Sequence, residues 1–180
     1  NINTAPTVAP TVTTPVTYCQ GQTADTLKAI ATTTGADLVW QDANHNTVLT
    51  PPTPTPSTII AGITTYYVYQ NIGHCNGPID SIKVIVVSKP NKNFTINPTT
   101  DIFVGQTIAF TPVQTTTANT YYWHFDDPTS TTANTSTSIL PTHAYNTAGT
   151  YCPKLIVTNQ VGCKDSTTFC LDVLSNISMI

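Results

Sequence analysis

The residues best suited to chemistry lie in the stretch YYWHFDD and shortly after it. His124, Asp126, Asp127 and His143 form a polar cluster of the kind that suggests metal binding or catalysis. Carboxylate oxygens from Asp126 and Asp127, together with loop carbonyls, would suit Ca²⁺. The structural interpretation is that both aspartates accept backbone N–H groups of a turn, and that His143 packs and hydrogen-bonds in a Pro-x-His-x-Tyr turn. We expect the structural role and no cofactor, with a Ca²⁺ site at Asp126 and Asp127 as the alternative.

The five cysteines pose a second chemical question. Cys152 and Cys170 lie symmetrically about the turn of an expected hairpin, so two adjacent strands would place them opposite each other. In the first half, Cys19 can staple the first strand region to Cys75 in a later turn. We therefore predict the disulfides Cys19–Cys75 and Cys152–Cys170, with Cys163 as the odd thiol. Pairing of Cys152 with Cys163 is the rival, and it closes a shorter loop.

The inventory of charged residues argues against an enzyme. The chain contains neither Glu nor Arg, so general acid–base chemistry would fall to scattered Asp and His side chains. Cys163 as a nucleophile would have only Lys164 beside it. The formal charge of −3 and the absence of arginine also argue against a nucleic-acid partner. No run approaches the ~18 apolar residues of a membrane span.

The composition is that of a β protein in an oxidising setting. Threonine fills 38 of 180 positions, and 8% of the residues are charged. Threonine suits half-exposed strands because its branched Cβ stiffens the side chain while its hydroxyl stays in water. Five cysteines in such a chain favour a location outside the cell or on its surface.

Breaks in composition divide the chain into parts. Residues 1–17 alternate proline and threonine with small apolar residues, which predicts an extended linker or an edge strand. The run SKPNKN then separates two longer segments. We predict sandwich domains over residues 18–88 and 94–180, joined by a linker at 89–93.

The two halves repeat one order of features, which predicts two tandem immunoglobulin-like β-sandwiches. Each half has a Gly-Gln-Thr, then a tryptophan strand, then an Ala-Gly corner, a β run, a Gly-containing turn and a cysteine. The aromatic residues expected in the two cores are Trp40, Trp123, Phe125, Tyr145 and Tyr151. Alternation places Tyr67 and Tyr69 on one face of a strand and Tyr66 on the other. We expect these three to pack, with a sugar-stacking platform as the alternative.

Most of residues 94–174 resemble the polycystic-kidney-disease (PKD) repeat. The matching motifs are Trp-x-Phe followed by an acidic turn, Pro-x-His-x-Tyr, Gly-Thr-Tyr and Leu-x-Val-x-Asn. Asp126 and Pro128 stand where the repeat usually has glycine. Residues 18–87 resemble the Cys-bracketed immunoglobulin-like modules of very large bacterial surface proteins, including adhesins of gliding bacteria and cargo of type IX secretion.

These resemblances imply a non-catalytic structural or adhesive segment of a secreted or cell-surface bacterial protein, such as an adhesin stalk or appendage. One alternative is a self-assembling extracellular filament subunit, in which the N-terminal arm pairs with a sheet edge of the next copy. Another is a carbohydrate- or protein-binding accessory module of a secreted enzyme. The partners implied are neighbouring modules, other copies, polysaccharide or a surface protein.

Three Asp-(Ser/Thr) sequences resemble an O-glycosylation signal used on proteins that bacteria export. They place candidate acceptors at Thr26, Ser81 and Ser166. Chance matches are the alternative in a chain so rich in threonine.

Overall fold

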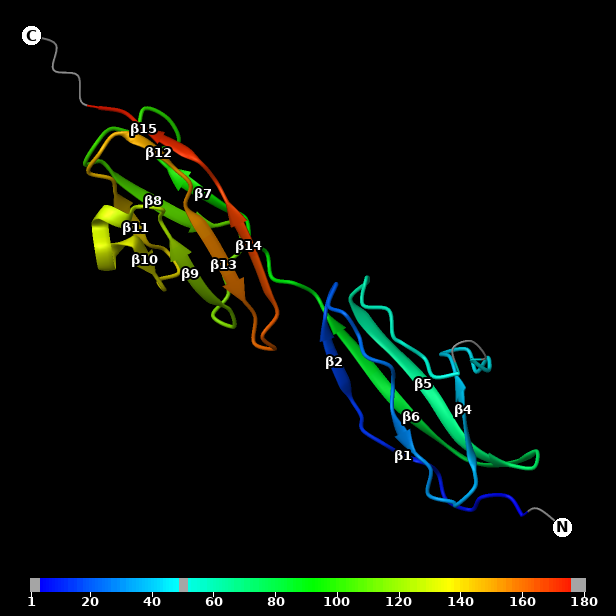
Figure 1. Ribbon diagram of the computed structural model, residues 1–180. Coiled ribbons are helices and arrows are strands. Elements are labelled where there is room, and N and C mark those ends of the chain that lie inside the picture. The colour runs from blue at the N-terminus through cyan, green and yellow to red at the C-terminus, as the bar shows by residue number, and fades with distance from the viewer. Residues whose placement is uncertain (1–3, 49–51, 176–180) are drawn as a thin grey trace, which may run out of the picture. The chain divides into compact units, whose positions relative to one another are not determined.

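The chain folds into two compact units, Asn1–Ser88 and Lys89–Ile180. The computed structural model describes residues 4–48 and 52–175. Both units are immunoglobulin-like β-sandwiches, and each has its own hydrophobic core (Figure 1). Trp40 is buried in the core of unit 1, and Trp123 is buried in the core of unit 2.

Unit 1 consists of a four-stranded sheet and a short two-stranded layer. The large sheet has the order β2-β6-β5-β4, and β1 pairs with β3. The strands are β1 (Thr11–Val12), β2 (Val16–Cys19), β3 (Ala29–Ile30), β4 (Asp37–Gln41), β5 (Gly62–Ile72) and β6 (Cys75–Val87). The core between the layers contains Tyr18, Leu27, Trp40, Val68, Ile82, Val84 and Val86.

A long hairpin, β5–β6, forms the centre of unit 1 (Figure 1). Two residues connect the strands, Gly73 and His74, with φ of 54° and 71°. Positive φ at both central residues is the geometry of a type I′ turn, whose twist matches that of the flanking strands. The turn therefore fixes the register in which Ile72 faces Cys75.

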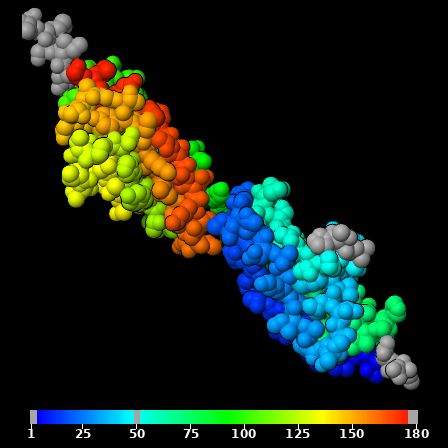
Figure 2. Space-filling model, viewed as in Figure 1, coloured from blue at the N-terminus to red at the C-terminus, as the bar shows by residue number. Residues whose placement is uncertain are grey.

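The N-terminal proline–threonine segment is part of unit 1. From Thr11 onward it supplies β1 and β2, and β2 pairs in parallel with β6 from Val16↔Val84 to Cys19↔Val87. β2 is therefore an edge strand of the large sheet, which is one of the two forms expected for this segment. Residues 1–3 lie outside the described part of the chain. The segment is the darkest blue in Figure 2, where it lies along the margin of unit 1 and later residues in lighter blue cover most of the visible face.

The side chain of Gln70 fastens the beginning of this segment. Gln70 is fully buried, and its Nε2 donates to the carbonyl oxygen of Val8 and to Oγ1 of Thr32, both at 2.8 Å. Its Oε1 accepts the N–H of Thr33 at 2.8 Å. One inward-facing amide thus joins β5, the N-terminal arm and the loop after β3.

The predicted disulfide Cys19–Cys75 is wrong. Cys19 ends β2 opposite Val87, whereas Cys75 begins β6, at the other end of that strand. Twelve residues of extended chain separate Cys75 from Val87, which is about 40 Å at ~3.3 Å per residue. A disulfide requires Cα atoms within about 7 Å. Cys19 is disulfide-bonded, and Cys75 is not its partner.

Unit 2 is a fuller sandwich. A sheet of order β10-β9-β13-β14 faces a sheet of order β11-β8-β7, and β12 pairs with β15. The elements are β7 (Phe94–Asn97), β8 (Thr107–Pro112), β9 (Thr120–His124), the 3₁₀ helix η1 (Pro128–Asn134), β10 (Thr135–Ser136), β11 (Thr142–Ala144), β12 (Gly149–Tyr151), β13 (Lys154–Thr158), β14 (Lys164–Thr168) and β15 (Leu171–Val173). Aromatic rings dominate the core, including Phe110, Trp123, Phe125 and Tyr145.

The Cys152–Cys170 disulfide lies between two strand pairings that share one register. On the β13–β14 side of the disulfide Lys154 faces Thr168, and on the β12–β15 side Tyr151 faces Leu171. Both pairs are centred on position 161, the midpoint expected from the sequence. The two cysteines have a Cα–Cα distance of 4.0 Å and are bonded, as predicted.

Cys163 differs from the prediction. It is 1% exposed and disulfide-bonded, so the expected odd thiol is not at this position. Its backbone N–H donates to Oδ1 of Asn159 at 2.9 Å, which closes the turn between β13 and β14. The spacing of cysteines within the hairpin predicts its register, but it does not identify which cysteines outside the Cys152–Cys170 pair are disulfide-bonded.

The segment predicted as a linker at 89–93 is tied to unit 2 at its end. Nζ of Lys92 lies 3.2 Å from Oδ1 of Asp165 on β14. The carbonyl oxygen of Asn93 accepts the N–H of Val113 at 2.8 Å. These contacts fix the last residues of the segment beside the sheet that they enter.

Candidate functional site

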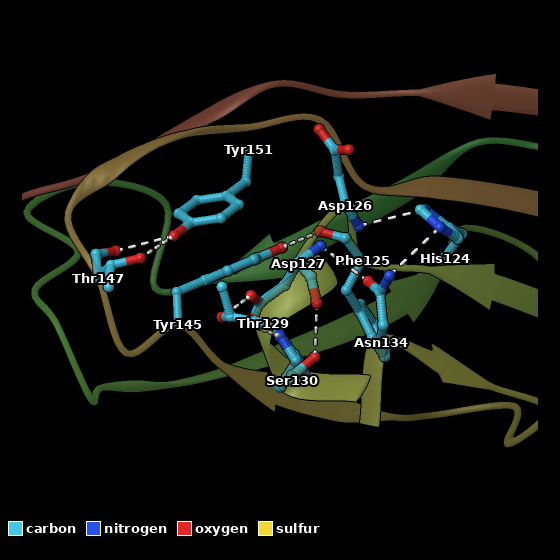
Figure 3. Close-up of polar contacts among 11 residues, drawn as sticks. His124, Phe125, Asp126, Asp127, Thr129, Ser130, Asn134, Tyr145, Thr147 and Tyr151 are labelled. Atoms are coloured by element: carbon cyan, nitrogen blue, oxygen red, sulfur yellow. Dashed lines mark hydrogen bonds and ion pairs between the residues drawn. The ribbon is translucent and has the colours of Figure 1, made fainter. Parts of the chain in front are cut away.

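The polar cluster predicted from the sequence lies where β9 leaves the sheet of unit 2 (Figure 3). Alternation continues past the end of the strand, so Trp123, Phe125 and Asp127 are buried while His124 and Asp126 are exposed. Asp126 has φ of +63°, in the left-handed region that glycine adopts most easily. The chain turns here with aspartate in place of glycine, and Pro128 then begins η1.

Asp127 and His143 form a buried pair. Oδ2 of Asp127 lies 3.1 Å from Nε2 of His143, and the two side chains are 1% and 4% exposed. Oδ1 of Asp127 accepts the hydroxyl of Thr129 at 2.6 Å. The ring of His143 stacks on Phe125 with a centroid distance of 4.4 Å. These contacts hold both the carboxylate and the imidazole in one orientation.

The electrostatics of this pair favour an ionised carboxylate. Burial alone would raise the pKa of Asp127. The hydrogen bonds from Thr129 and His143, together with the charge of His143, lower this pKa by more than burial raises it. The net effect is a pKa below the ordinary aspartate value. Asp127 is therefore a structural anion, stabilised by its neighbours instead of by water.

Two tyrosines close the other side of the cluster. The hydroxyl of Tyr145 donates to the carbonyl oxygen of Phe125 at 2.8 Å, and that of Tyr151 donates to the carbonyl oxygen of Thr147 at 3.0 Å. Their rings stack with centroids 4.0 Å apart. Burial, followed by the charges of Asp127 and Asp126, raises the pKa of Tyr145. The hydroxyl hydrogen bonds and the ring stack resemble the tyrosine corner of immunoglobulin-like sandwiches.

Asp126 has different partners from its neighbour. Its backbone N–H donates to Nδ1 of His124 at 3.2 Å, and its Oδ2 accepts the N–H of Cys152 at 3.0 Å. Asn134 lies behind the turn, where its Oδ1 accepts the N–H of Asp127 at 2.7 Å. The two carboxylates therefore do not share a site. The expectation that both accept N–H groups of the local turn is confirmed for Asp127, which accepts a backbone hydrogen bond from Thr129 as well as side-chain hydrogen bonds. It is wrong for Asp126, whose carboxylate accepts the N–H of the distant Cys152.

This arrangement uses its polar groups internally. Among the described residues, no buried side-chain nitrogen or oxygen lacks a hydrogen-bond partner. In the same part of the chain, no group of three His, Cys, Asp or Glu side chains is placed to hold a metal ion. The cluster can orient strands and a turn, and its chemistry is that of a structural hydrogen-bond network.

The remaining predicted site residues are spread over both units. Thr26 is exposed, while Ser81 on β6 and Ser166 on β14 are half-buried. Both serines have the same local geometry, in which Oδ1 of the preceding aspartate accepts the serine N–H, at 2.7 Å for Ser81 and 2.8 Å for Ser166. Tyr66 packs against the core of unit 1, and Tyr67 and Tyr69 face outward on β5.

Sequence reasoning missed two polar residues that organise the units, Gln70 and Asn134. For Gln70 a signal was present, because alternation along β5 places it on the same inward face as Val68. A glutamine at an inward position of a strand indicates a buried hydrogen-bond network. Asn134 lies seven residues after Asp127, and local spacing carries no comparable signal for it.

Comparison with known proteins finds a family match in unit 2 and similar solved structures. The family model of the PKD domain matches residues 88–173. The PKD1 domain of Vibrio anguillarum Epp is similar at 24% identity, over 48% of this chain and 95% of that chain, with a TM-score of 0.38. The fibronectin(III)-like modules of Clostridium thermocellum CbhA are similar at 10% identity, over 93% of both chains, with a TM-score of 0.40. No curated protein matches the sequence.

No helix among the described residues has the length and apolar character required to cross a membrane.

Proposed function

We propose that this chain is a non-catalytic, load-bearing segment of an exported bacterial surface protein, such as an adhesin stalk or surface appendage. The PKD-domain match of residues 88–173 and the disulfide in unit 2 support a module that works outside the cell. The internal use of polar groups in the cluster of unit 2 supports a structural role. The resemblance of residues 18–87 to modules of gliding-bacterial adhesins supports a parent protein exported by the type IX route.

The observation that carries the proposal is that β2 and β6, the strands by which the chain enters and leaves the large sheet of unit 1, are neighbours. β2, where the chain enters the sheet, lies beside β6, from which it leaves, and the two run parallel. A pull on the two ends of the unit therefore slides β2 along β6 and loads all of their hydrogen bonds together. Gln20 extends this ladder, since its N–H donates to the carbonyl oxygen of Val87 at 2.8 Å.

Unit 2 has a smaller parallel contact of the same kind. Phe103 bridges Leu174 in parallel, with hydrogen bonds from Leu174 N–H to the Ile102 carbonyl at 2.8 Å and from Val104 N–H to the Leu174 carbonyl at 3.0 Å. The Cys152–Cys170 disulfide then joins the last two long strands covalently. Unit 1 thus has the longer parallel ladder, and in unit 2 the Cys152–Cys170 bond supplements a shorter one.

Proline scanning of β2 tests the load-bearing role with a matched control. The N–H of Cys19 donates outward, to Oε1 of Gln22, so alternation points the N–H groups of Val16 and Tyr18 toward β6 and that of Thr17 away. Val16→Pro removes a ladder donor, and Thr17→Pro does not. In single-molecule stretching of the whole chain, Val16→Pro should unfold unit 1 about fivefold faster at a given force, the effect of losing ~1 kcal/mol.

Thr17→Pro should leave the unfolding rate under force unchanged. If the two variants unfold alike, or if unit 1 yields without a measurable resisting force, the load-bearing proposal is wrong. The filament alternative is not our proposal, because the arm that would reach the next copy is already paired with β3 and β6 of its own unit.

A further inference from the structure

The outer face of the large sheet in unit 1 presents two adjacent rows of side chains, which we name the tyrosine face. The rows cross β4, β5 and β6 in register, and they are Gln41–Tyr67–Ser81 and Val39–Tyr69–Ile79. Their sequence neighbours Trp40, Val68 and Ile82 point inward and are 3%, 0% and 1% exposed. Since side chains alternate along a strand, the six members of the tyrosine face point outward.

This face is more apolar than an outward sheet surface needs to be. Antiparallel sheets with one solvated face normally place polar residues there. The row Val39–Tyr69–Ile79 contains two aliphatic side chains and an aromatic ring, and Ile79 is 52% exposed. Val39 and Tyr69 are half-buried beside it, so the row forms a partly exposed apolar strip of the kind that interaction sites use.

The hydroxyl groups of the tyrosine face are available to a ligand, whereas the amide oxygen of Gln41 already contacts His45. In the described part of the chain, the hydroxyls of Tyr67, Tyr69 and Ser81 form no hydrogen bond, whereas those of Tyr145 and Tyr151 in unit 2 are used internally. The ring of His45 stacks on Tyr67 with centroids 4.1 Å apart, and its Nδ1 lies 3.4 Å from Oε1 of Gln41. The imidazole therefore supports one side of the aromatic row.

The chemistry of the six side chains selects the ligand. None of them carries a charge, so the face offers no ion pair to a phosphate, a sulfate or an acidic chain. They stand on the outer face of the sheet, whereas two hollows of unit 1 lie along β1 and the segment around Leu27. An open face with aromatic rings and free hydroxyl groups suits an extended, uncharged, polyhydroxylated chain.

We propose that the tyrosine face binds a neutral polysaccharide. The C–H faces of the sugar rings would lie on Tyr67, Tyr69 and the flanking Val39 and Ile79. The sugar hydroxyls would bond to Gln41, Ser81 and the tyrosine hydroxyls. This binding goes beyond the load-bearing role, and neither activity requires the other.

Affinity electrophoresis and sedimentation of the whole chain test the proposal. The soluble probes are mixed-linkage β-glucan, xylan and galactomannan, the insoluble probes are cellulose and chitin, and the charged comparison is alginate. The double variant Tyr67→Ala/Tyr69→Ala should weaken binding to a neutral probe by about tenfold or more. Ile79→Ser should weaken it less. Tyr122→Ala is the matched control, since Tyr122 is 43% exposed on the outer face of unit 2.

The proposal is supported if at least one neutral polysaccharide retains the unchanged protein and the Tyr122→Ala variant but does not retain the double variant. Absence of retention across the neutral panel would overturn it, and so would retention by alginate alone or an equal loss in Tyr122→Ala. Unchanged thermal unfolding of the variants shows that lost binding is not lost folding. The Val16→Pro stretching experiment does not depend on this face, so either proposal can fail alone.

Discussion

Removing the Cys152–Cys170 bond should lengthen unit 2 when the protein is stretched. The bond joins residues 18 positions apart in the sequence whose Cα atoms are 4.0 Å apart. While it holds, the segment between them cannot extend after the strands separate. An extended chain spans up to ~3.6 Å per residue, so releasing 18 residues adds about 60 Å beyond the distance already spanned.

Single-molecule stretching can measure this length directly. We would compare Cys152→Ser/Cys170→Ser with a chain that keeps both cysteines, and in both proteins Cys19 and Cys163 would be serine. Cys152–Cys170 is then the disulfide that differs. The unfolding step of unit 2 should gain about 60 Å of contour length, and the step of unit 1 should stay the same. Equal lengths in the two proteins would refute the reasoning.

The same pair of proteins should differ in equilibrium stability. In the chain-entropy description, closing a loop of this size stabilises the folded state by about 3 kcal/mol, because the unfolded chain loses freedom. Chemical denaturation of unit 2, monitored by the fluorescence of Trp123, measures this difference. A free energy of unfolding that does not change would contradict the expected contribution of the bond.

Three further predictions concern Asp127, Gln70 and the candidate glycosylation sites. Because the pKa of Asp127 is lowered in the folded state, its contribution to stability is present above the ordinary aspartate pKa and is lost as pH falls through the lower folded value. Asp127→Asn should cost about 1–3 kcal/mol at pH 7 and progressively less below pH ~4, measured by urea unfolding across pH; a difference that does not vary with pH would contradict this. Gln70→Leu should lower the stability of unit 1 by about 1–3 kcal/mol and expose the arm around Val8 to protease, since the Val8 carbonyl and the Thr33 N–H lose their partner; an unchanged cleavage rate would contradict it. Intact mass of the native protein should show added hexose at Thr26, Ser81 or Ser166, and an unmodified mass would remove that hypothesis.

Some of the fold followed from the sequence because local rules determine it. The hairpin of β13 and β14 has its turn at position 161, and once the turn is fixed, the pairing of Cys152 with Cys170 follows from counting. Alternation likewise places Trp123 and Phe125 inside. These predictions use only distances along one or two neighbouring strands.

The prediction for Cys19 failed because it compared positions in two halves of a sequence, which says nothing about distance in space. β6 is 13 residues long, so its two ends lie far apart, and Cys19 and Cys75 lie at opposite ends. The sequence grouped His143 with Asp127 in one polar cluster, but the direct contact of the two side chains could not be predicted. His143 arrives from β11, 16 residues later, and only the packing of two sheets brings it to the carboxylate.

Because the protein has few charged residues, its folding stability should depend little on the salt concentration of the solution. The described residues contain two ion pairs, the exposed Lys92–Asp165 and the buried Asp127–His143. At 0.1 M, dissolved salt largely screens the interaction of exposed charges more than about 10 Å apart, and it screens buried pairs much less. It does not weaken apolar packing or backbone ladders. Brine and fresh water should therefore leave each unit with the same fold.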